Sequence, residues 1–288
     1  MFASALELKE VLAGLDYLVD KKTATVVFLA LKLNKPLLIE GPSGVGKTEL
    51  ANVLALATSR QLIRLQCYEG LDEAKALYEW DYQKQLLRLH VEKNSGKDWG
   101  EVKQDIFTVE FILQRPLLKA LMSPDPVVLL IDEVDKSDEE FESFLLEILS
   151  DYQVTIPEIG TIRASSIPLV VLTSNNTRQL SDALKRRCIH LYLDYPDAAR
   201  ELAIVRLKVP SLKQDLARQV VNFVQNLRRE KLKKAPSIAE TIDWARALLA
   251  LKVDDLTEEV MDETINVLLK YQADIEKLGD KKISAYMP

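Results

Sequence analysis

Cysteine is scarce in this chain, and long apolar runs are absent. The two cysteines, Cys67 and Cys188, form no metal-binding or redox motif, so we expect buried thiols in a disulfide-free, cytoplasmic protein. No apolar run approaches the ~18 residues of a membrane-spanning helix. Residues 1–4 also lack the basic region followed by an apolar core that a signal peptide shows. The sequence therefore predicts neither a membrane span nor a secretion signal.

An excess of positive charge is also lacking. Lys and Arg number 38 against 44 Asp and Glu, for a net charge of −6. This balance argues against a protein that wraps nucleic acid. One basic run, 228–234, is a candidate nucleic-acid patch, but lysines also complement the carboxyl end of a helix, and we prefer that interpretation. The length allows one large domain or two small ones.

The most informative stretch is 41–48, which fits the pattern G-x-x-x-x-G-K-[ST]. A short apolar run precedes it and a helical pattern follows, as in the phosphate-binding loop of P-loop NTPases. Its glycines let backbone N–H groups surround a phosphate. Lys47 would reach the β- and γ-phosphates of ATP, and the hydroxyl of Thr48 would ligate Mg²⁺. The predicted nucleotide-binding residues are Gly41, Pro42, Ser43, Gly44, Val45, Gly46, Lys47, Thr48 and Glu49.

A continuous apolar run at 127–131 predicts a central strand covered on both faces, and it ends in two carboxylates. We predict that Asp132 holds Mg²⁺ together with Thr48. Glu133, one residue further, is positioned to polarise the attacking water as a general base. Two adjacent acids also occur in ordinary turns at strand ends, but the phosphate loop upstream favours the catalytic interpretation.

Two later segments offer the other groups that phosphoryl transfer requires. Asn175 ends the predicted fourth strand and could orient the water or sense the γ-phosphate, with Asn176 as the alternative. Arg186 and Arg187 end a short helical stretch just before the fifth strand. One of them could act on the nucleotide of a neighbouring subunit, and a surface arginine pair is the alternative interpretation.

The order of elements predicts an α/β domain of five strands alternating with helices, followed by a helical domain. We expect a parallel sheet with the strand order 5-1-4-3-2, in which the fourth strand lies between the first and the third. A hairpin is predicted over 153–164, and a solvated loop over 92–105. Between the second and third strands we expect helices over 72–89 and 111–122. After 196 the pattern predicts helices over 197–208, 211–230, 238–251 and 256–277. We therefore predict a nucleotide-binding core of 1–194 and a helical lid of 195–288.

This order of parts resembles that of AAA+ ATPases. The hairpin resembles the pre-sensor-1 hairpin of the helix-2-insert group. The stretches 132–137, 154–158, 173–175, 182–188 and 240–245 are similar to the MoxR family, and closest to its CoxD-like branch. The resemblance implies that Arg187 acts as the arginine finger, with Arg186 as the alternate. It also implies a homo-oligomeric ring, expected to be a hexamer, with ATP at the subunit interfaces.

The resemblance further implies a remodelling machine with a chaperone-like role in assembling another enzyme. Its expected partners are a protein with a von Willebrand factor A domain and a client metalloenzyme or complex. One departure concerns 236–241, where MoxR relatives often carry a sensor 2 arginine and this chain has none. Arg246 lies further along the helix and is a poor substitute. Two rival hypotheses are a nucleic-acid-associated NTPase motor, which the acidic charge opposes, and a non-hydrolysing scaffold, which Asp132 and Glu133 oppose.

Overall fold

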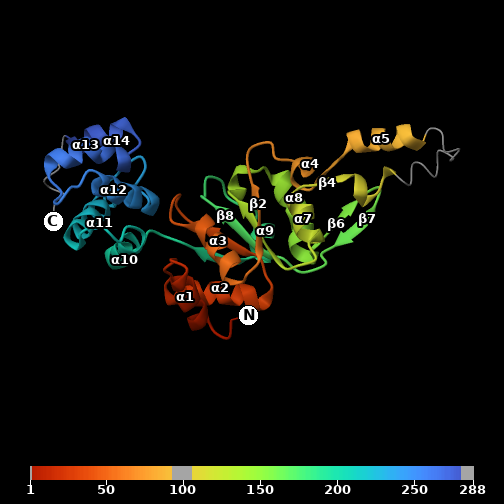
Figure 1. Ribbon diagram of the computed structural model, residues 1–288, viewed down its shortest axis with the longest axis horizontal. Helices are drawn as coiled ribbons and strands as arrows, with labels where there is room; N and C mark the ends of the chain where they lie inside the picture. The colour runs from red at the N-terminus through yellow and green to blue at the C-terminus, as the bar shows by residue number, and fades with distance from the viewer. Residues whose placement is uncertain (1, 93–105, 280–288) are drawn as a thin grey trace. The chain divides into compact units, whose positions relative to one another are not determined.

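The computed structural model describes residues 2–92 and 106–279 (Figure 1). Most of the predicted loop over 92–105 therefore lies outside the described residues. The chain forms two compact units. The first comprises 1–8, 21–40 and 48–191, and the second comprises 9–20, 41–47 and 192–288 as far as they are described.

A five-stranded sheet forms the centre of the first unit, in the order β2-β5-β8-β1-β9. Numbered along the chain, these are the five predicted strands in the predicted order 5-1-4-3-2, and the parallel α/β fold is confirmed. Parallel register aligns Gln66 with Asp132, Ile131 with Leu172 and Ile39 with Thr173, so the carboxyl ends of these strands meet at one edge. The strands are β1 (Leu37–Glu40), β2 (Gln61–Gln66), β5 (Val127–Asp132), β8 (Leu169–Ser174) and β9 (Ile189–Tyr192).

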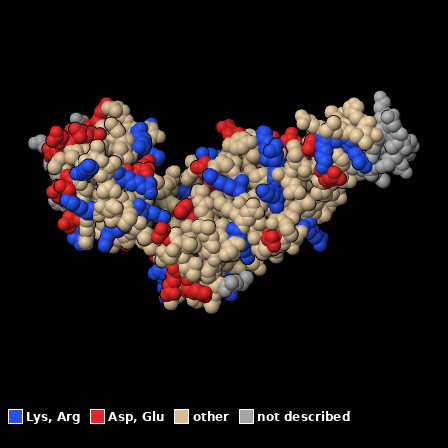
Figure 2. All heavy atoms as spheres, in the orientation of Figure 1, with Lys and Arg blue, Asp and Glu red and all other residues tan. Residues whose placement is uncertain are grey.

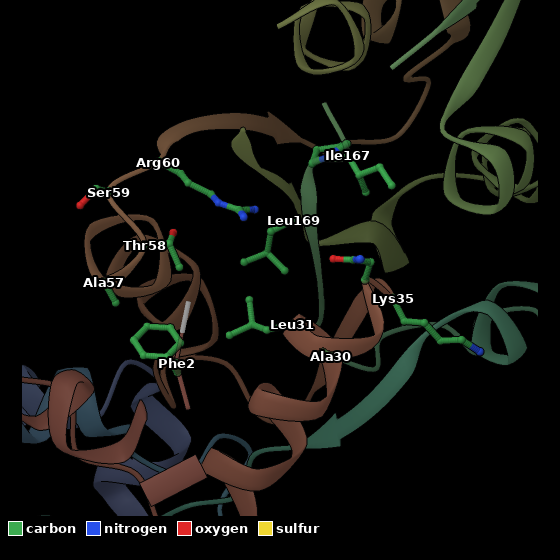
Figure 3. A pocket seen from close by; sticks show the side chains of 12 residues that line it. Phe2, Ala30, Leu31, Lys35, Ala57, Thr58, Ser59, Arg60, Ile167 and Leu169 are labelled. Carbon is green, nitrogen blue, oxygen red and sulfur yellow. The ribbon is translucent and has the colours of Figure 1, made fainter. Parts of the chain in front are cut away.

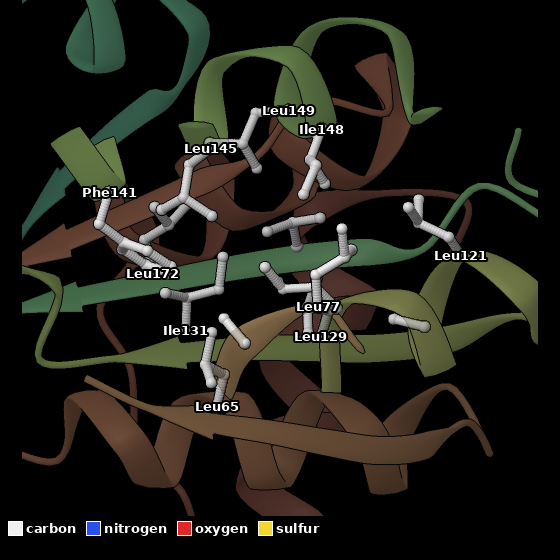
Figure 4. Close-up of a cluster of buried hydrophobic side chains, with 14 of the residues drawn as sticks. Leu65, Leu77, Leu121, Leu129, Ile131, Phe141, Leu145, Ile148, Leu149 and Leu172 are labelled. Carbon is white, nitrogen blue, oxygen red and sulfur yellow. The ribbon is translucent and has the colours of Figure 1, made fainter. Parts of the chain in front are cut away.

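Helices cover the sheet because its central strands are apolar on both faces. Every residue of β5 and β8 is buried. Alternate residues such as Leu129 and Ile131 face one side, where they pack on Phe141, Leu145 and other residues of α8 (Figure 4). Each such burial contributes about 1.5–3 kcal/mol. Helices from this stretch of the chain include α1 (Ala5–Gly14), which is divided between the two units, α2 (Lys21–Leu33), α3 (Lys47–Ala57), α7 (Pro116–Met122), α8 (Glu139–Asp151) and α9 (Asp182–Arg187).

The prediction of two helices between β2 and β5 is wrong in part. The chain there forms α4 (Glu73–Ala76), β3 (Tyr78–Trp80), α5 (Tyr82–Glu92), the 3₁₀ turn η1 (Val109–Phe111) and β4 (Ile112–Gln114). β3 and β4 pair antiparallel across a long separation in sequence, which local periodicity does not reveal. The helix predicted from Phe111 begins at Pro116, because a proline disfavours helical geometry in the residue before it and Arg115 is extended.

The predicted hairpin is confirmed. It consists of β6 (Gln153–Ile156) and β7 (Gly160–Arg163), joined by a turn at 157–159. Gly160 has a φ of +96°, which favours glycine. Burial raises the pKa of both thiols, Cys67 and Cys188, to about 12, and neither cysteine forms a disulfide. Both thiols are therefore protonated and unreactive at neutral pH.

The second unit is mainly helical and has an apolar core of its own. Trp244 and Phe223 are fully buried in that core, with their ring centroids 5.3 Å apart. The last predicted helix is divided in two, since Leu269 is extended. No glycine or proline marks this break. The helices are α10 (Ala198–Lys208), α11 (Gln214–Arg228), α12 (Ile238–Ala250), α13 (Glu258–Leu268) and α14 (Gln272–Gly279). Among the described residues, no helix has the length and apolarity that crossing a membrane requires.

Candidate nucleotide-binding site

The loop 41–47 joins β1 to α3 and has the geometry of an anion nest. Gly44 and Gly46 have φ values of +76° and +95°, in the left-handed region that anion-binding loops use and that favours glycine. The ammonium of Lys47 donates to the carbonyl oxygens of Gly41 and Pro42, each at 2.7 Å. The loop thus holds a buried cation among its own backbone groups, as a phosphate-binding loop requires.

The structure brings together the two residues predicted to hold Mg²⁺. The hydroxyl of Thr48 donates to Asp132 Oδ1 at 3.0 Å. Thr173, on the neighbouring strand β8, donates to the same oxygen at 2.5 Å. Hydroxyl and carboxylate oxygens are the hard ligands that Mg²⁺ prefers, so this donor set fits the ion.

Glu133 has an unusual backbone conformation. Its φ of 56° and ψ of 49° lie in the left-handed region, which is uncommon for a residue other than glycine and costs about 1–3 kcal/mol. Its N–H donates to Thr173 Oγ1 at 2.9 Å. The Glu133 and Asp132 carboxylates, although adjacent in sequence, are therefore bound by different groups.

Three side chains bind the Glu133 carboxylate. Asn175 donates its amide N–H to Oε1 at 3.0 Å, and Gln66 donates to Oε2 at 2.8 Å. Lys136 forms an ion pair with Oε2 at 2.7 Å. Of the two asparagines proposed from the sequence, Asn175 makes the contact with Glu133, whereas the N–H of Asn176 donates to Ser174. An amide bound to the candidate base is well placed to orient a water beside it.

Asp135 fixes the backbone that carries Asn175. It accepts hydrogen bonds from the N–H of Asn175 at 3.1 Å and from the N–H and hydroxyl of Thr177 at 2.9 and 2.6 Å. Burial acts to raise the pKa of Asp135, but these hydrogen bonds outweigh it and hold the pKa below its ordinary value. Asp135 is therefore ionised at neutral pH and anchors the loop after β8.

Sequence reasoning missed Arg64, Gln66 and Thr173. Arg64 and Gln66 alternate with the buried residues Ile63 and Leu65, so they share one face of β2. The predicted strand order already placed β2 beside the strand that ends in Asp132. Strand alternation combined with that order is the signal that could have found these two polar residues.

The two arginines at the end of α9 differ in their contacts. Arg187 donates from Nε to Ser150 Oγ at 2.5 Å and from Nη1 to the carbonyl of Ala183 at 3.0 Å. Arg186 is exposed and makes no ion pair or hydrogen bond with the described residues. Arg186 can therefore contact a neighbouring molecule without losing a hydrogen bond. Arg187 would first have to break its two hydrogen bonds, to Ser150 and Ala183.

A separate cavity of about 320 Å³ lies at the amino ends of the strands, away from this site (Figure 3). The ends of α2 and α3 and the start of β8 line it, with Leu31, Arg60 and Leu169 among its residues. None of the predicted site residues lines this cavity. The cavity and the predicted site residues therefore lie at opposite edges of the sheet.

The fold and the site together define a P-loop ATPase of the AAA+ class. A family model described as AAA domain (dynein-related subfamily) matches residues 36–188, more than half of the chain, and the chain belongs to this family.

Relatives of similar length include uncharacterized proteins from two staphylococci. One from Staphylococcus aureus (strain COL) is 28% identical over 259 residues, and the match covers 87% of each chain. One from Staphylococcus haemolyticus (strain JCSC1435) is 25% identical over 257 residues, again with 87% of each chain covered. Among solved structures, the Thermotoga maritima RuvB Holliday junction branch migration motor is similar, with a TM-score of 0.50 and 18% identity. That match covers 86% of this chain and 67% of the other, and it supports the fold alone.

Proposed function

We propose that this protein hydrolyses ATP to ADP and phosphate and uses the cycle to remodel or mature a partner protein. The observation that carries this proposal is the cluster at the carboxyl edge of the sheet. There Thr48 and Asp132 are hydrogen-bonded, and Asn175 binds the Glu133 carboxylate at 3.0 Å. In our proposal, Glu133 accepts the proton of the attacking water and Asn175 orients that water.

The other roles follow from the same geometry. Lys47 would exchange its two loop carbonyls for phosphate oxygens, which are stronger acceptors because they are charged. Bound Mg²⁺ would neutralise charge on the phosphates. Thr48 and Asp132 would hold the ion, and Thr173 keeps the Asp132 carboxylate in position. The core and lid remain proposed as 1–194 and 195–288.

An exposed apolar surface on α5 supports a protein partner. Leu86, Leu87 and Val91 are 56%, 68% and 74% exposed, although an amphipathic helix ordinarily buries such side chains. Figure 1 shows α5 at the same end of the first unit as the hairpin β6–β7. We propose that this face of α5 contacts the partner. From the resemblance to the CoxD-like branch of the MoxR family, we propose a von Willebrand factor A domain protein and a client metalloenzyme or complex as partners.

A homo-oligomeric ring, which we propose to be a hexamer, would complete the site. Arg187 is the proposed finger by position in the MoxR-like stretch 182–188, and Arg186 is the alternate because it has no partner among the described residues. Either guanidinium would stabilise charge on a neighbour's γ-phosphate. The ring would change shape because its ATP and ADP states make different contacts there.

The basic run 228–234 gives little support to a nucleic-acid motor. Arg228 ends α11 and is buried in an ion pair with Glu201, and the ammonium of Lys233 lies over the ring of Tyr271. Figure 2 shows basic and acidic side chains interspersed over the face in view. DNA- or RNA-stimulated ATPase activity with a steep salt dependence is the result that would favour the motor.

An affinity pull-down tests the remodelling role. Glu133→Gln should retain ATP and stall with its partner bound, so we expect it to recover a von Willebrand factor A protein or a metalloenzyme subunit. Lys47→Ala, which should not bind ATP, is the matched control and should recover neither. Recovery of a nuclease subunit with nucleic acid by the stalled variant would overturn the proposal.

A further inference from the structure

One cation in the site has no role in the chemistry described above. Arg64 lies on the edge strand β2, and its Nη2 is 2.5 Å from Asp132 Oδ2. The same nitrogen donates to Gln66 Oε1 at 2.6 Å. The side chain of Arg64 is 51% exposed, whereas that of Asp132 is 2% exposed. A half-exposed arginine therefore reaches inward to the buried carboxylate that is proposed to hold Mg²⁺.

The two oxygens of Asp132 have different partners. Oδ1 accepts from the hydroxyls of Thr48 and Thr173, which are neutral. Oδ2 accepts from the guanidinium of Arg64, and more weakly from Thr48 at 3.3 Å. A buried carboxylate without a positive partner is costly, so the Arg64 guanidinium serves as the counterion of Asp132.

We propose that Arg64 is a positioning residue that holds Asp132 before nucleotide binds and competes with Mg²⁺ for this carboxylate. This inference rests on the proposed function. Two cations at one carboxylate repel each other, so the ion pair of Arg64 has to break or lengthen when the metal is held there. Arg64 can leave at low cost because its side chain is long and half exposed, whereas Thr173 keeps Asp132 in place.

The chain offers a matched control. Arg60 directly precedes β2, and Arg64 lies near its other end. Arg60 lines the cavity at the amino ends of the strands and forms no ion pair with the described residues. Arg60→Gln and Arg64→Gln remove the same charge from the same strand region, but only the second removes a contact with Asp132.

The test is the Mg²⁺ dependence of nucleotide binding, followed with the fluorescent analogue mant-ADP. We expect Arg64→Gln to lower the half-saturating concentration of Mg²⁺ by about three- to tenfold, because the competing cation is gone. Arg60→Gln should leave this concentration unchanged. Arg64→Lys retains a cation with a less favourable geometry and should give an intermediate value.

The possible outcomes distinguish a failure of the Arg64 inference from a failure of the proposed function. An unchanged or higher half-saturating concentration in the Arg64 variants would overturn the inference, with nucleotide binding still intact. Failure of the wild-type protein to bind mant-ADP at any Mg²⁺ concentration would overturn the proposed function itself. Circular dichroism establishes that each variant is folded, and Arg64→Lys carries the test if Arg64→Gln does not fold.

Discussion

Glu133 and Asp135 lie two residues apart, yet the fold uses the two carboxylates differently. Glu133 is bound by side chains that can exchange partners, Gln66 and Lys136 among them. Asp135 is buried and bound mainly by the loop that follows β8. The Glu133 carboxylate is thus the one we propose for catalysis, whereas that of Asp135 holds the loop around it.

Asp135 should make stability depend on pH in the acid range. Its pKa is lowered in the folded state, so its contribution is present above the unfolded pKa of about 3.9 and is lost as pH falls through the folded pKa. We expect Asp135→Asn to cost about 1–3 kcal/mol at pH 7, with the gap to wild type narrowing below about pH 4. Urea unfolding at a series of pH values measures this.

The exposed Asp215 provides the control for that series. It pairs with Arg218 on the surface of α11, so Asp215→Asn should change the free energy of unfolding by less than about 1 kcal/mol at every pH. A cost of Asp135→Asn that stays constant from pH 7 to pH 3 would contradict the account.

At the residue scale, the site residues proposed from the sequence belong to contiguous motifs. Lys47, Thr48, Asp132 and Glu133 were proposed because their spacing along the chain fits phosphate and Mg²⁺ binding, and the structure brings Thr48 and Asp132 into contact. Arg64 acts across the sheet, and its contact with Asp132 depends on the register of β2 against β5. That contact is set by tertiary pairing, which no local spacing encodes.

Among the elements, α10, α11 and α12 are joined by one buried ionic network. Both oxygens of Glu201 accept from Arg228, at 2.6 and 2.7 Å, and Thr241 donates to Glu201 at 2.9 Å. The side chains of Glu201 and Arg228 are 0% and 7% exposed, and Arg228 lies over the ring of Tyr195. The network links three helices to the segment that precedes them.

Glu201→Gln should therefore destabilise the second unit strongly. It leaves the Arg228 charge buried without an ionic partner, which costs about 3–5 kcal/mol. Asp254→Asn, which breaks the exposed pair with Lys213, is the control and should cost less than about 1 kcal/mol. Chemical denaturation compares the two variants, and equal costs would count against a structural role for the buried pair.

The element α5 carries the proposed partner surface, which a paired substitution can test. Leu86→Ser with Leu87→Ser removes two exposed leucines, so we expect the free energy of unfolding to change by less than about 1 kcal/mol and ATP turnover to stay at the wild-type rate. Recovery of the partner in the pull-down should fall several-fold. Leu33→Ser, an exposed leucine of α2, is the control, and undiminished recovery by the α5 variant would contradict the proposed surface.

The sequence predicted regular elements well and the segment between β2 and β5 poorly. The apolar runs of β5 and β8 identify buried strands because both faces of the sheet are covered. β3 and β4 are three residues each and pair across α5, so neither has enough length for a pattern. Tyr78 and Trp80 stabilise this small sheet through an edge-to-face contact at 6.0 Å, where the sequence suggested a continuous helix.

For the whole molecule, the predicted strand order 5-1-4-3-2 is the one observed. In a parallel sheet the carboxyl ends of all strands meet at one edge, so the phosphate loop and the acidic pair lie together there. By contrast, the grouping of residues 41–47 with the second unit could not be predicted from the sequence. This grouping depends on contacts between segments far apart along the chain, which composition and periodicity do not show.

Our central claim is that the edge where Asp132 and Glu133 lie hydrolyses ATP with Glu133 as the base. The most direct measurement is steady-state ATP turnover of Glu133→Gln, together with its ATP affinity. We predict affinity close to wild type and turnover at least ~10²-fold slower, because the amide cannot accept the proton of the attacking water. Turnover near the wild-type rate would contradict the claim.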